Sequence, residues 1–503
     1  MEGGKKVPIR LAKGAIYRRT ALQPEERILT KDRIMEYASL DGLTKMTGVE
    51  PENFDLYILK ELIDNGLDAC ETYGMRPELH IVIEIKNNLL YLTVTDNGPG
   101  IQDQAIKEMT NFTRFSGTKY YVKKPTRGAQ GNALMTILGI PGIVSYIEGK
   151  NVLEPIRIAT KDYIYLLRII IDKVMQKIEP QIEKSKSEPH DDNFGTNITV
   201  CLPLNPTFVQ QEEMDSDEVN DETKKERMWG SYERYYDLVE GFYLWNPHAE
   251  FYFRFNNKDE ARKGEYFRAS SSKVNKFAHK GFGSPHWYKE EDFIELVHAN
   301  IRANKERGKK ETLINFAKRF KGCTGNRSEL TEALTKGFPE KFIDDLTTDE
   351  KAKILFDNLK KVSKPLEIRV LGEIGKDHLR KVIDRYEIQD ESLFKYAKIK
   401  SMDNGIPYVL EVAFGVVKKL EGRRVQFGIN QTITYKLPFE QEQFEADLKK
   451  DDYQSVYSTY GIDGLLKSLH ITEADPVFIA MHLTSPNIRY EDYGKSEVGL
   501  NSD

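Results

Sequence analysis

Apolar and polar residues alternate in two consecutive segments, residues 80–85 and 89–95, and Asn87-Asn88 stands between them. Alternation with a period of two is typical of a strand, and a short asparagine turn between two such runs indicates a β-hairpin. The second run leads directly into Asp96-Asn97-Gly98-Pro99-Gly100-Ile101. The pattern therefore predicts a hairpin that delivers an acidic residue, followed by glycines, to one end of a sheet.

Residues 58–68 follow the period of a helix instead. The apolar residues on one side are Ile58, Leu59, Leu62 and Ile63. The polar residues, at positions i, i+4 and i+7, are Glu61, Asn65 and Asp68. Residues with this spacing share one face of an α-helix, so the segment predicts a helix with one packed face and one face that does chemistry.

The period of the apolar residues also divides the rest of the chain into helical and extended segments. The runs are helical at 228–244, extended at 249–255, helical and poor in strands at 292–361, and extended again at 409–417, 424–428 and 477–483. A chain of 503 residues, of which 39% are hydrophobic, can form several cores. We therefore predict an α+β protein with three domains: residues 1–275, 276–365 and 366–503.

The polar helix face and the acidic turn carry groups that suit a nucleotide. The amide oxygen of Asn65 suits Mg²⁺, a hard ion that binds few protein ligands alongside substrate phosphates. Glu61, one turn earlier, is placed to orient and deprotonate a water that attacks the γ-phosphate. The Asp96 carboxylate can accept the amino proton of adenine, while Gly98 and Gly100 let the backbone approach the ring. Together these residues predict an ATP site.

Glycine-rich segments follow the acidic turn. Residues 116–119 precede a glycine-rich loop, residues 126–133, which runs into an apolar helical segment. Backbone amides in such a loop and at a helix start cradle phosphates, although the spacing of a P-loop is missing. Residues 116–119 fit a surface loop equally well. The further candidate nucleotide contacts are Asp68, Ile101, Ser116, Gly117, Thr118, Lys119, Gly128, Ala129, Gln130, Gly131, Asn132, Ala133 and Thr196, the last expected beside Asp96.

Composition and cysteine usage narrow the class of protein. The three cysteines lie far apart without C-x-x-C spacing, which argues against a disulfide scaffold and a cysteine zinc site. The longest apolar stretch, residues 163–171, is interrupted by Arg168 and is too short to span a bilayer. No signal-peptide pattern is present at the start. We therefore expect neither export nor membrane insertion, but a cytoplasmic, nucleoid-associated protein.

Charge is unevenly distributed, although the net charge is only −5. Residues 212–226 contain eight acids and two lysines, a run that is typical of a solvated insertion, here at about 206–227. Residues 302–321 contain eight Lys or Arg and two Glu. A basic helix face is more often solvated surface than a binding site. This segment is nevertheless the best candidate for binding the phosphates of double-stranded DNA.

The polar helix, the acidic turn, the glycine loop and the strand entry at Thr196, in this order, resemble the nucleotide-binding fold of gyrase, heat-shock protein 90, histidine kinases and MutL, the GHKL family. The resemblance implies an α/β-sandwich (Bergerat) ATPase domain that uses ATP and Mg²⁺. The positions that match the family motifs are Glu61, Asn65, Asp96, Gly98, Gly100, Gly128, Gly131 and Thr196. A bare D-x-G-x-G is weak evidence, because acid-glycine turns occur in many loops.

Later segments resemble landmarks of the DNA topoisomerase VI B-subunit family; they are residues 246–250, 284–287, 312–316, 371–375 and 482–495. The likeness implies a helix-two-turn-helix domain at 276–365 and a ribosomal-protein-like transducer from 366. It also implies that Lys495 contacts the γ-phosphate. The glycine loop departs from the family, since a second glutamine and a further glycine are missing. Only eight residues follow Lys495, so the helix that docks the DNA-cleaving A subunit is absent from this sequence.

Two functions remain open from the sequence. The first is an ATP-dimerised DNA clamp that gates DNA passage in a type II topoisomerase, with an A-subunit-like partner to cut the DNA. The second is a stand-alone GHKL ATPase in repair, chromosome structuring or mobile-element defence. A neighbouring gene for an A-subunit-like protein distinguishes them.

Overall fold

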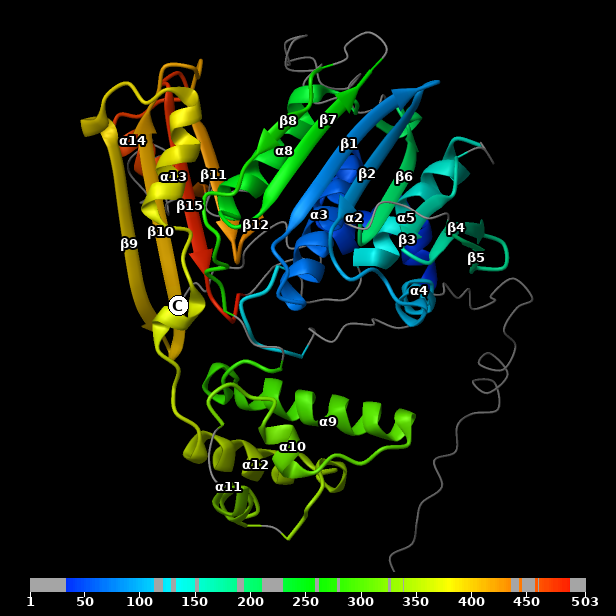
Figure 1. The fold of residues 1–503 in the computed structure, drawn as a ribbon, viewed down its shortest axis with the longest axis vertical. Helices are drawn as coiled ribbons and strands as arrows, with labels where there is room; N and C mark the ends of the chain where they lie inside the picture. The colour runs from blue at the N-terminus through cyan, green and yellow to red at the C-terminus, as the bar shows by residue number, and fades with distance from the viewer. Residues whose placement is uncertain are drawn as a thin grey trace, which may run out of the picture.

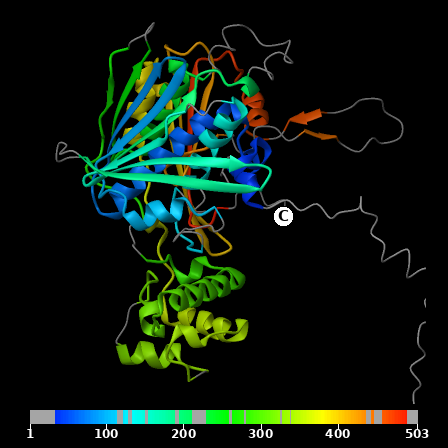
Figure 2. The same cartoon turned by 90° about the vertical axis from the view of Figure 1, so that its right-hand side faces the viewer.

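The computed structural model describes residues 33–112, 121–127, 133–149, 153–187, 194–209, 229–257, 262–277, 281–323, 327–337, 339–435, 443–445, 457–459 and 461–488. Two β-sheets stand side by side, and a helical segment lies at one end of the long axis (Figures 1 and 2). None of the helices in these residues is long and apolar enough to cross a membrane.

The first sheet has eight strands in the order β5-β4-β3-β6-β2-β1-β7-β8. The predicted hairpin is confirmed, because β1 and β2 pair antiparallel with Lys86 opposite Leu89. Asn87 and Asn88 have φ values of 53° and 60°, as a two-residue turn of this hand requires. The strands are β1 (Glu78–Lys86), β2 (Leu89–Asp96), β3 (Ile156–Thr160), β4 (Tyr163–Asp172), β5 (Lys177–Lys186), β6 (Thr196–Pro203), β7 (Glu250–Asn256) and β8 (Glu265–Phe267).

Helices α3, α5 and α8 pack against this sheet. The predicted polar helix is α3, which begins at Phe54 and ends at Thr72; its apolar residues Ile58, Leu59 and Ile63 are completely buried. The α-helices of this part are α2 (Leu40–Thr47), α3 (Phe54–Thr72), α4 (Asp103–Met109), α5 (Ala133–Ile147) and α8 (Tyr232–Trp245). The short 3-10 helices in the described residues are η1 (Arg33–Ala38), η2 (Pro51–Asn53), η3 (Pro285–Trp287), η4 (Ile343–Asp345), η5 (Ile368–Leu371), η6 (Asp384–Tyr386) and η7 (Glu391–Leu393).

The segment after residue 285 is helical, as its pattern predicts. Its core is a cluster of its own, in which Phe293, Phe316, Phe320 and Phe356 pack ring against ring. The helices are α9 (Glu290–Arg307), α10 (Leu313–Ala317), α11 (Arg327–Leu334) and α12 (Asp349–Val362). This separate core allows the segment to stand apart from the two sheets in Figure 1.

The second sheet has five strands in the order β12-β11-β15-β10-β9, and β11 runs parallel to β15. The predicted strands at 409–417, 424–428 and 477–483 correspond to β10, β11 and β15. Strand β9 was not predicted, because most of its side chains are exposed and its sequence does not alternate. The elements are β9 (Phe394–Asp403), β10 (Ile406–Val416), β11 (Arg424–Ile429), β12 (Thr432–Ile433), β15 (Val477–Thr484), α13 (Lys376–Ile383), α14 (Gly461–Ser468) and the separate pair β13 (Gln443–Glu445) and β14 (Tyr457–Thr459).

The two sheets share one hydrophobic core. Helix α8 lies between them (Figure 1), with β7 on one side and β12 on the other. Leu379 and Val382 of α13 and Ile433 of β12 belong to the same buried cluster as the core of the first sheet. The turn between β11 and β12 is thereby held close to α3, where the candidate site lies.

Candidate nucleotide site

The polar face of α3 is largely buried rather than solvated. Glu61 is 8% exposed, and Lys60 beside it is 1% exposed. The ammonium of Lys60 donates to Glu61 Oε1 at 3.0 Å and to Asp64 Oδ2 at 3.0 Å. Burial lowers the pKa of Lys60, but the charges of Asp64 and Glu61 outweigh that effect and hold it well above its ordinary value. Lys60 therefore stays protonated between the two carboxylates.

Asn65 presents an unsatisfied amide. Its Nδ2 is buried and has no hydrogen-bond partner, although a buried polar group is costly to leave unpaired. The oxygen and nitrogen of an amide exchange by a simple flip, so this atom marks a position for either a donor or an acceptor. In the described part of the chain no three His, Cys, Asp or Glu side chains form a metal cluster. The unpaired amide of Asn65 fits an ion that takes one protein amide oxygen and its remaining ligands from phosphate and water.

The acidic turn packs directly against α3. Asp96 ends β2, pairs in register with Thr196 of β6, and accepts from the backbone N–H of Gly98 at 2.7 Å. Burial raises the pKa of Asp96 to about 6, against the opposing effect of the bonds from Gly98 and Thr196. A Cβ on Gly98 would lie 2.8 Å from Asp96 Oδ1, and one on Gly66 of α3 would lie 3.3 Å from Asp96 Cβ. These glycines allow the helix and the turn to approach; the sequence pattern did not single out Gly66.

Gly100 and Ile101 continue the turn. Gly100 has a φ of +87°, which an L side chain rarely adopts, so glycine is required there. Gly195, just before β6, is in contact with the same turn, since a Cβ there would lie 2.2 Å from the carbonyl oxygen of Gly98. Asp96, Gly98, Gly100 and Thr196 are therefore brought together as the sequence motifs predict.

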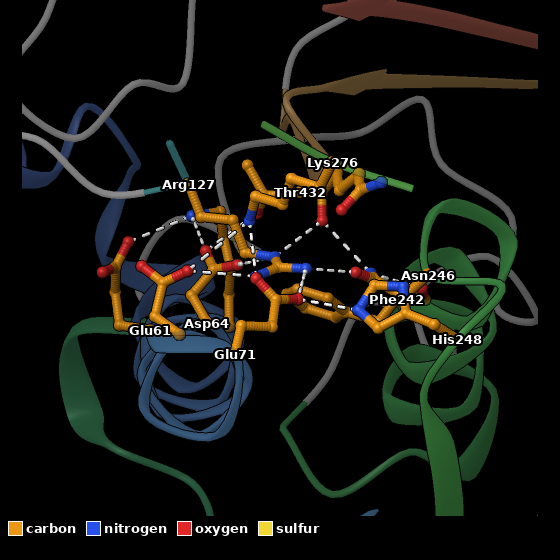
Figure 3. A network of polar contacts seen from close by, with 12 residues as sticks. Glu61, Asp64, Glu71, Arg127, Phe242, Asn246, His248, Lys276 and Thr432 are labelled. Carbon is orange, nitrogen blue, oxygen red and sulfur yellow. Dashed lines mark hydrogen bonds and ion pairs between the residues drawn. The ribbon is translucent and has the colours of Figure 1, made fainter. Parts of the chain in front are cut away.

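Arg127 is another residue of this region that the sequence analysis did not identify. It stands just before the predicted phosphate loop and is completely buried. Its guanidinium donates to Asp68 Oδ1 at 3.0 Å, to both oxygens of Glu71 at 2.6 and 2.7 Å, and to the side chain of Asn246. Its Nε donates to the carbonyl of Gln431 at 3.0 Å. Four segments far apart in the sequence thus meet at one side chain (Figure 3).

Glu71 is the second centre of this network. Lys276 lies 2.8 Å from its Oε2, and His248 Nε2 lies 2.8 Å from its Oε1. Burial raises the pKa of Glu71, but the charges of Arg127 and Lys276 prevail and hold it well below its ordinary range. Asn246 and His248 lie in the segment 246–250, which the sequence analysis named as a family landmark without assigning it a role.

A turn from the second sheet completes the network. Thr432 Oγ1 donates to Asp64 Oδ2 at 2.8 Å. Asn430 and Gln431, with φ values of 50° and 66°, form the two-residue turn between β11 and β12. The N–H of Gln431 donates to His482 Nε2 at 2.9 Å. The turn of the second sheet therefore contacts α3 through Thr432. The backbone of the turn is held by hydrogen bonds with Arg127 and His482.

Several predicted site residues lie outside the described residues. They are Ser116, Gly117, Thr118, Lys119, Gly128, Ala129, Gln130, Gly131, Asn132 and Lys495. Only the backbone of Ala133 is described, at the start of α5. The acidic run 212–226 also lies outside. The structure therefore neither places these groups near Asp96 nor separates them from it.

The basic segment lies on the helical part, around the end of α9 and directly after α10. Lys305, Arg307, Lys309 and their basic neighbours Lys310 and Lys318 are exposed. Arg319 is not a free cation in this group, because it bonds to Asn300 and Glu311 and its guanidinium lies 4.0 Å from the centre of the Phe282 ring.

Comparison with known proteins agrees with this geometry. Residues 55–206 match the family model described as histidine kinase-, DNA gyrase B-, and HSP90-like ATPase. The chain is 24% identical over 454 residues to the B subunit of type 2 DNA topoisomerase 6 from Metallosphaera sedula, an alignment that covers 88% of this chain and 74% of that protein. Its counterpart from Sulfurisphaera tokodaii is 23% identical over 451 residues, with the same coverage of each chain. Residues 55–206 therefore match the model of the GHKL ATPases, within a chain that is similar to the topoisomerase 6 B subunit along most of its length.

Proposed function

We propose that this chain binds and hydrolyses ATP as a subunit of a type II DNA topoisomerase, and that ATP closes two copies of it into a clamp on DNA. One observation carries the ATPase part. Glu61 and the unsatisfied amide of Asn65 stand one helical turn apart on α3, and the next residue, Gly66, packs against Asp96. The contact of Gly66 with Asp96 supports a site in which the proposed base and ion ligand lie close to the proposed adenine acceptor.

The assigned roles follow from the chemistry of each group. Asp96 accepts the adenine amino proton, and the glycines beside it let the ring approach. Asn65 holds Mg²⁺, which neutralises charge on the phosphates. Glu61 accepts a proton from water as the water oxygen bonds to the γ-phosphorus; the bond from that phosphorus to the bridging oxygen breaks, and ADP leaves with the electron pair. Residues 116–119 and 128–133 contact the phosphates, and Lys495 contacts the γ-phosphate.

Hydrolysis tests the ATPase part. Glu61→Gln keeps the size of the side chain and removes the base, so turnover should fall on the order of 10²- to 10⁴-fold while ATP binding is retained. Steady-state hydrolysis and calorimetry with a non-hydrolysable analogue measure the two quantities separately. Wild-type turnover in Glu61→Gln would remove this residue from the mechanism.

DNA gating rests on the similarity to the topoisomerase 6 B subunit and on the exposed basic residues of 302–321. Purification from the native host, followed by mass spectrometry, tests the partnership. A DNA-cleaving A-subunit-like protein in the complex supports the topoisomerase. Its absence, with ATP-dependent dimerisation retained, supports a stand-alone ATPase clamp in repair, chromosome structuring or mobile-element defence.

A further inference from the structure

Lys60 is a buried cation that donates hydrogen bonds to Glu61, the proposed base, and to a second carboxylate, Asp64. Its side chain is 1% exposed, and those of Glu61 and Asp64 are 10% and 5% exposed. A buried charge is retained in a fold only when it is well paired, and here each carboxylate receives one N–H at 3.0 Å. The bond to Glu61 is made to Oε1. The other oxygen, Oε2, is the one that we assign to the attacking water.

Asp64 extends this contact to the second sheet. The same oxygen, Oδ2, accepts from Lys60 and from the hydroxyl of Thr432, 368 residues further along the chain. Thr432 is 3% exposed and belongs to β12, next to the fixed Asn430-Gln431 turn. Oδ1 of Asp64 is buried without a hydrogen-bond partner. The position of Asp64 thus depends on the ammonium of Lys60 and the hydroxyl of Thr432, both at Oδ2, and on Arg127, whose Nε lies 3.9 Å from Oδ1.

We propose that Thr432, Asp64 and Lys60 act as positioning residues that orient Glu61, so that hydrolysis depends on the placement of the β11–β12 turn against α3. The inference rests on the proposed role of Glu61. When Thr432 withdraws, Asp64 loses its hydroxyl donor and competes more strongly for the ammonium of Lys60. That competition weakens the bond to Glu61 Oε1, and the carboxylate rotates away from the angle at which Oε2 meets the water.

Thr432→Val tests the first link, because valine keeps the shape of threonine and removes the hydroxyl. We expect kcat to fall roughly tenfold, a part of the contribution of a general base, with the affinity for a non-hydrolysable ATP analogue unchanged. Thr434→Val is the matched control: it lies on the same segment, and its hydroxyl bonds to the carbonyl of Phe427 instead. Thr432→Ser keeps a hydroxyl and should restore the rate.

A double variant tests whether the links act in series. Lys60→Met alone should lower kcat at least as much as Thr432→Val, since it removes the direct contact with Glu61. In the combined variant the second substitution should add little, because coupled residues are not additive. Losses that multiply would show independent effects and overturn the proposal. An equal loss of analogue affinity in Thr432→Val would likewise show a structural role only.

Glu61→Gln separates this inference from the proposed function. If Glu61→Gln abolishes hydrolysis but Thr432→Val behaves as Thr434→Val does, the base is correct and the positioning chain is wrong. If Glu61→Gln hydrolyses ATP at the wild-type rate, the proposed base is itself wrong. The nucleotide-dependent dimer fraction is measured in every variant, so that a change in kcat is not confused with a change in assembly.

Discussion

Arg127→Met should destabilise the protein far more than a substitution that removes an exposed ion pair with the same N···O distance. Arg127 Nη2 lies 2.6 Å from Glu71 Oε1, and Arg76 Nη2 lies 2.6 Å from Glu250 Oε1. The side chains of the first pair are 0% and 10% exposed, whereas those of the second are 48% and 42% exposed. The two ion pairs therefore have the same N···O distance and differ in the burial of their side chains.

The expected magnitudes follow from that difference. Removing one partner of a buried pair costs about 3 to 5 kcal/mol, because the other charge is left unpaired. Lys276 stays 2.8 Å from Glu71, but Asp68 and Asn246 also lose a buried donor, so we expect a loss within that range, about 3 to 5 kcal/mol. Arg76→Met should cost about 0 to 1 kcal/mol, since water replaces an exposed pair. The free energy of unfolding at neutral pH should therefore separate the two variants clearly.

Denaturant titration followed by tryptophan fluorescence measures this difference. Trp245 is a suitable probe, because its ring stacks on His482 of the second sheet at 5.3 Å. The pKa of Glu71 is held below its ordinary value of 4.5, so its contribution is complete above about pH 4.5 and is lost as the pH falls toward the folded pKa. The gap between wild type and Arg127→Met should shrink in that acidic range. Equal losses in Arg127→Met and Arg76→Met at pH 7 would refute the reasoning.

Three further predictions concern ligands. Asp96→Ala should bind ATP about tenfold more weakly or worse, since a charge-assisted hydrogen bond of about 1.5 to 3 kcal/mol is lost. In calorimetry, the affinity of the wild type for ATP should also fall as the pH drops through about 6, where Asp96 gains a proton. The variant Asp96→Asn should lack this pH dependence. Reversing Lys305, Arg307 and Lys309 should weaken binding of double-stranded DNA and lower the salt slope by about 2.7, at about 0.9 per phosphate contact; an unchanged slope would exclude this face. Lys495→Ala should reduce both turnover and analogue-driven dimerisation in light scattering, and wild-type dimerisation would leave this lysine without a role in the clamp.

The elements that the sequence predicted are those whose signal is local. The hairpin ending at Asp96 and helix α3 both arise from short periodic patterns, and each is found within a few residues of its expected position. Strand β5, from Lys177 to Lys186, shows the opposite case. It is one of the two edge strands of the first sheet, and almost all of its side chains are exposed, so its sequence carries no alternation to recognise.

The buried network could not be predicted, because its partners are distant in the sequence. Arg127 and Gln431 are 304 residues apart, and Asp64 and Thr432 are 368 residues apart. A lone arginine in a glycine-rich loop looks like a phosphate ligand or a surface residue. The structure shows instead that Arg127 is completely buried among Asp68, Glu71 and Asn246.

Helix α3 combines two adjacent polar stripes. Residues 60, 64, 68 and 71 follow one another at spacings of three or four. The last three of them bond to other segments of the protein, and Lys60 bonds to Asp64. Residues 61 and 65 lie on the neighbouring stripe, one residue round the helix, and carry the assigned base and ion ligand. In the proposed positioning chain, Thr432 of the second sheet acts on Asp64 of the first stripe, and the ammonium of Lys60 passes the change to the carboxylate of Glu61 on the second stripe. The polar residues outside the nucleotide motifs thus make the site sensitive to the position of the second sheet.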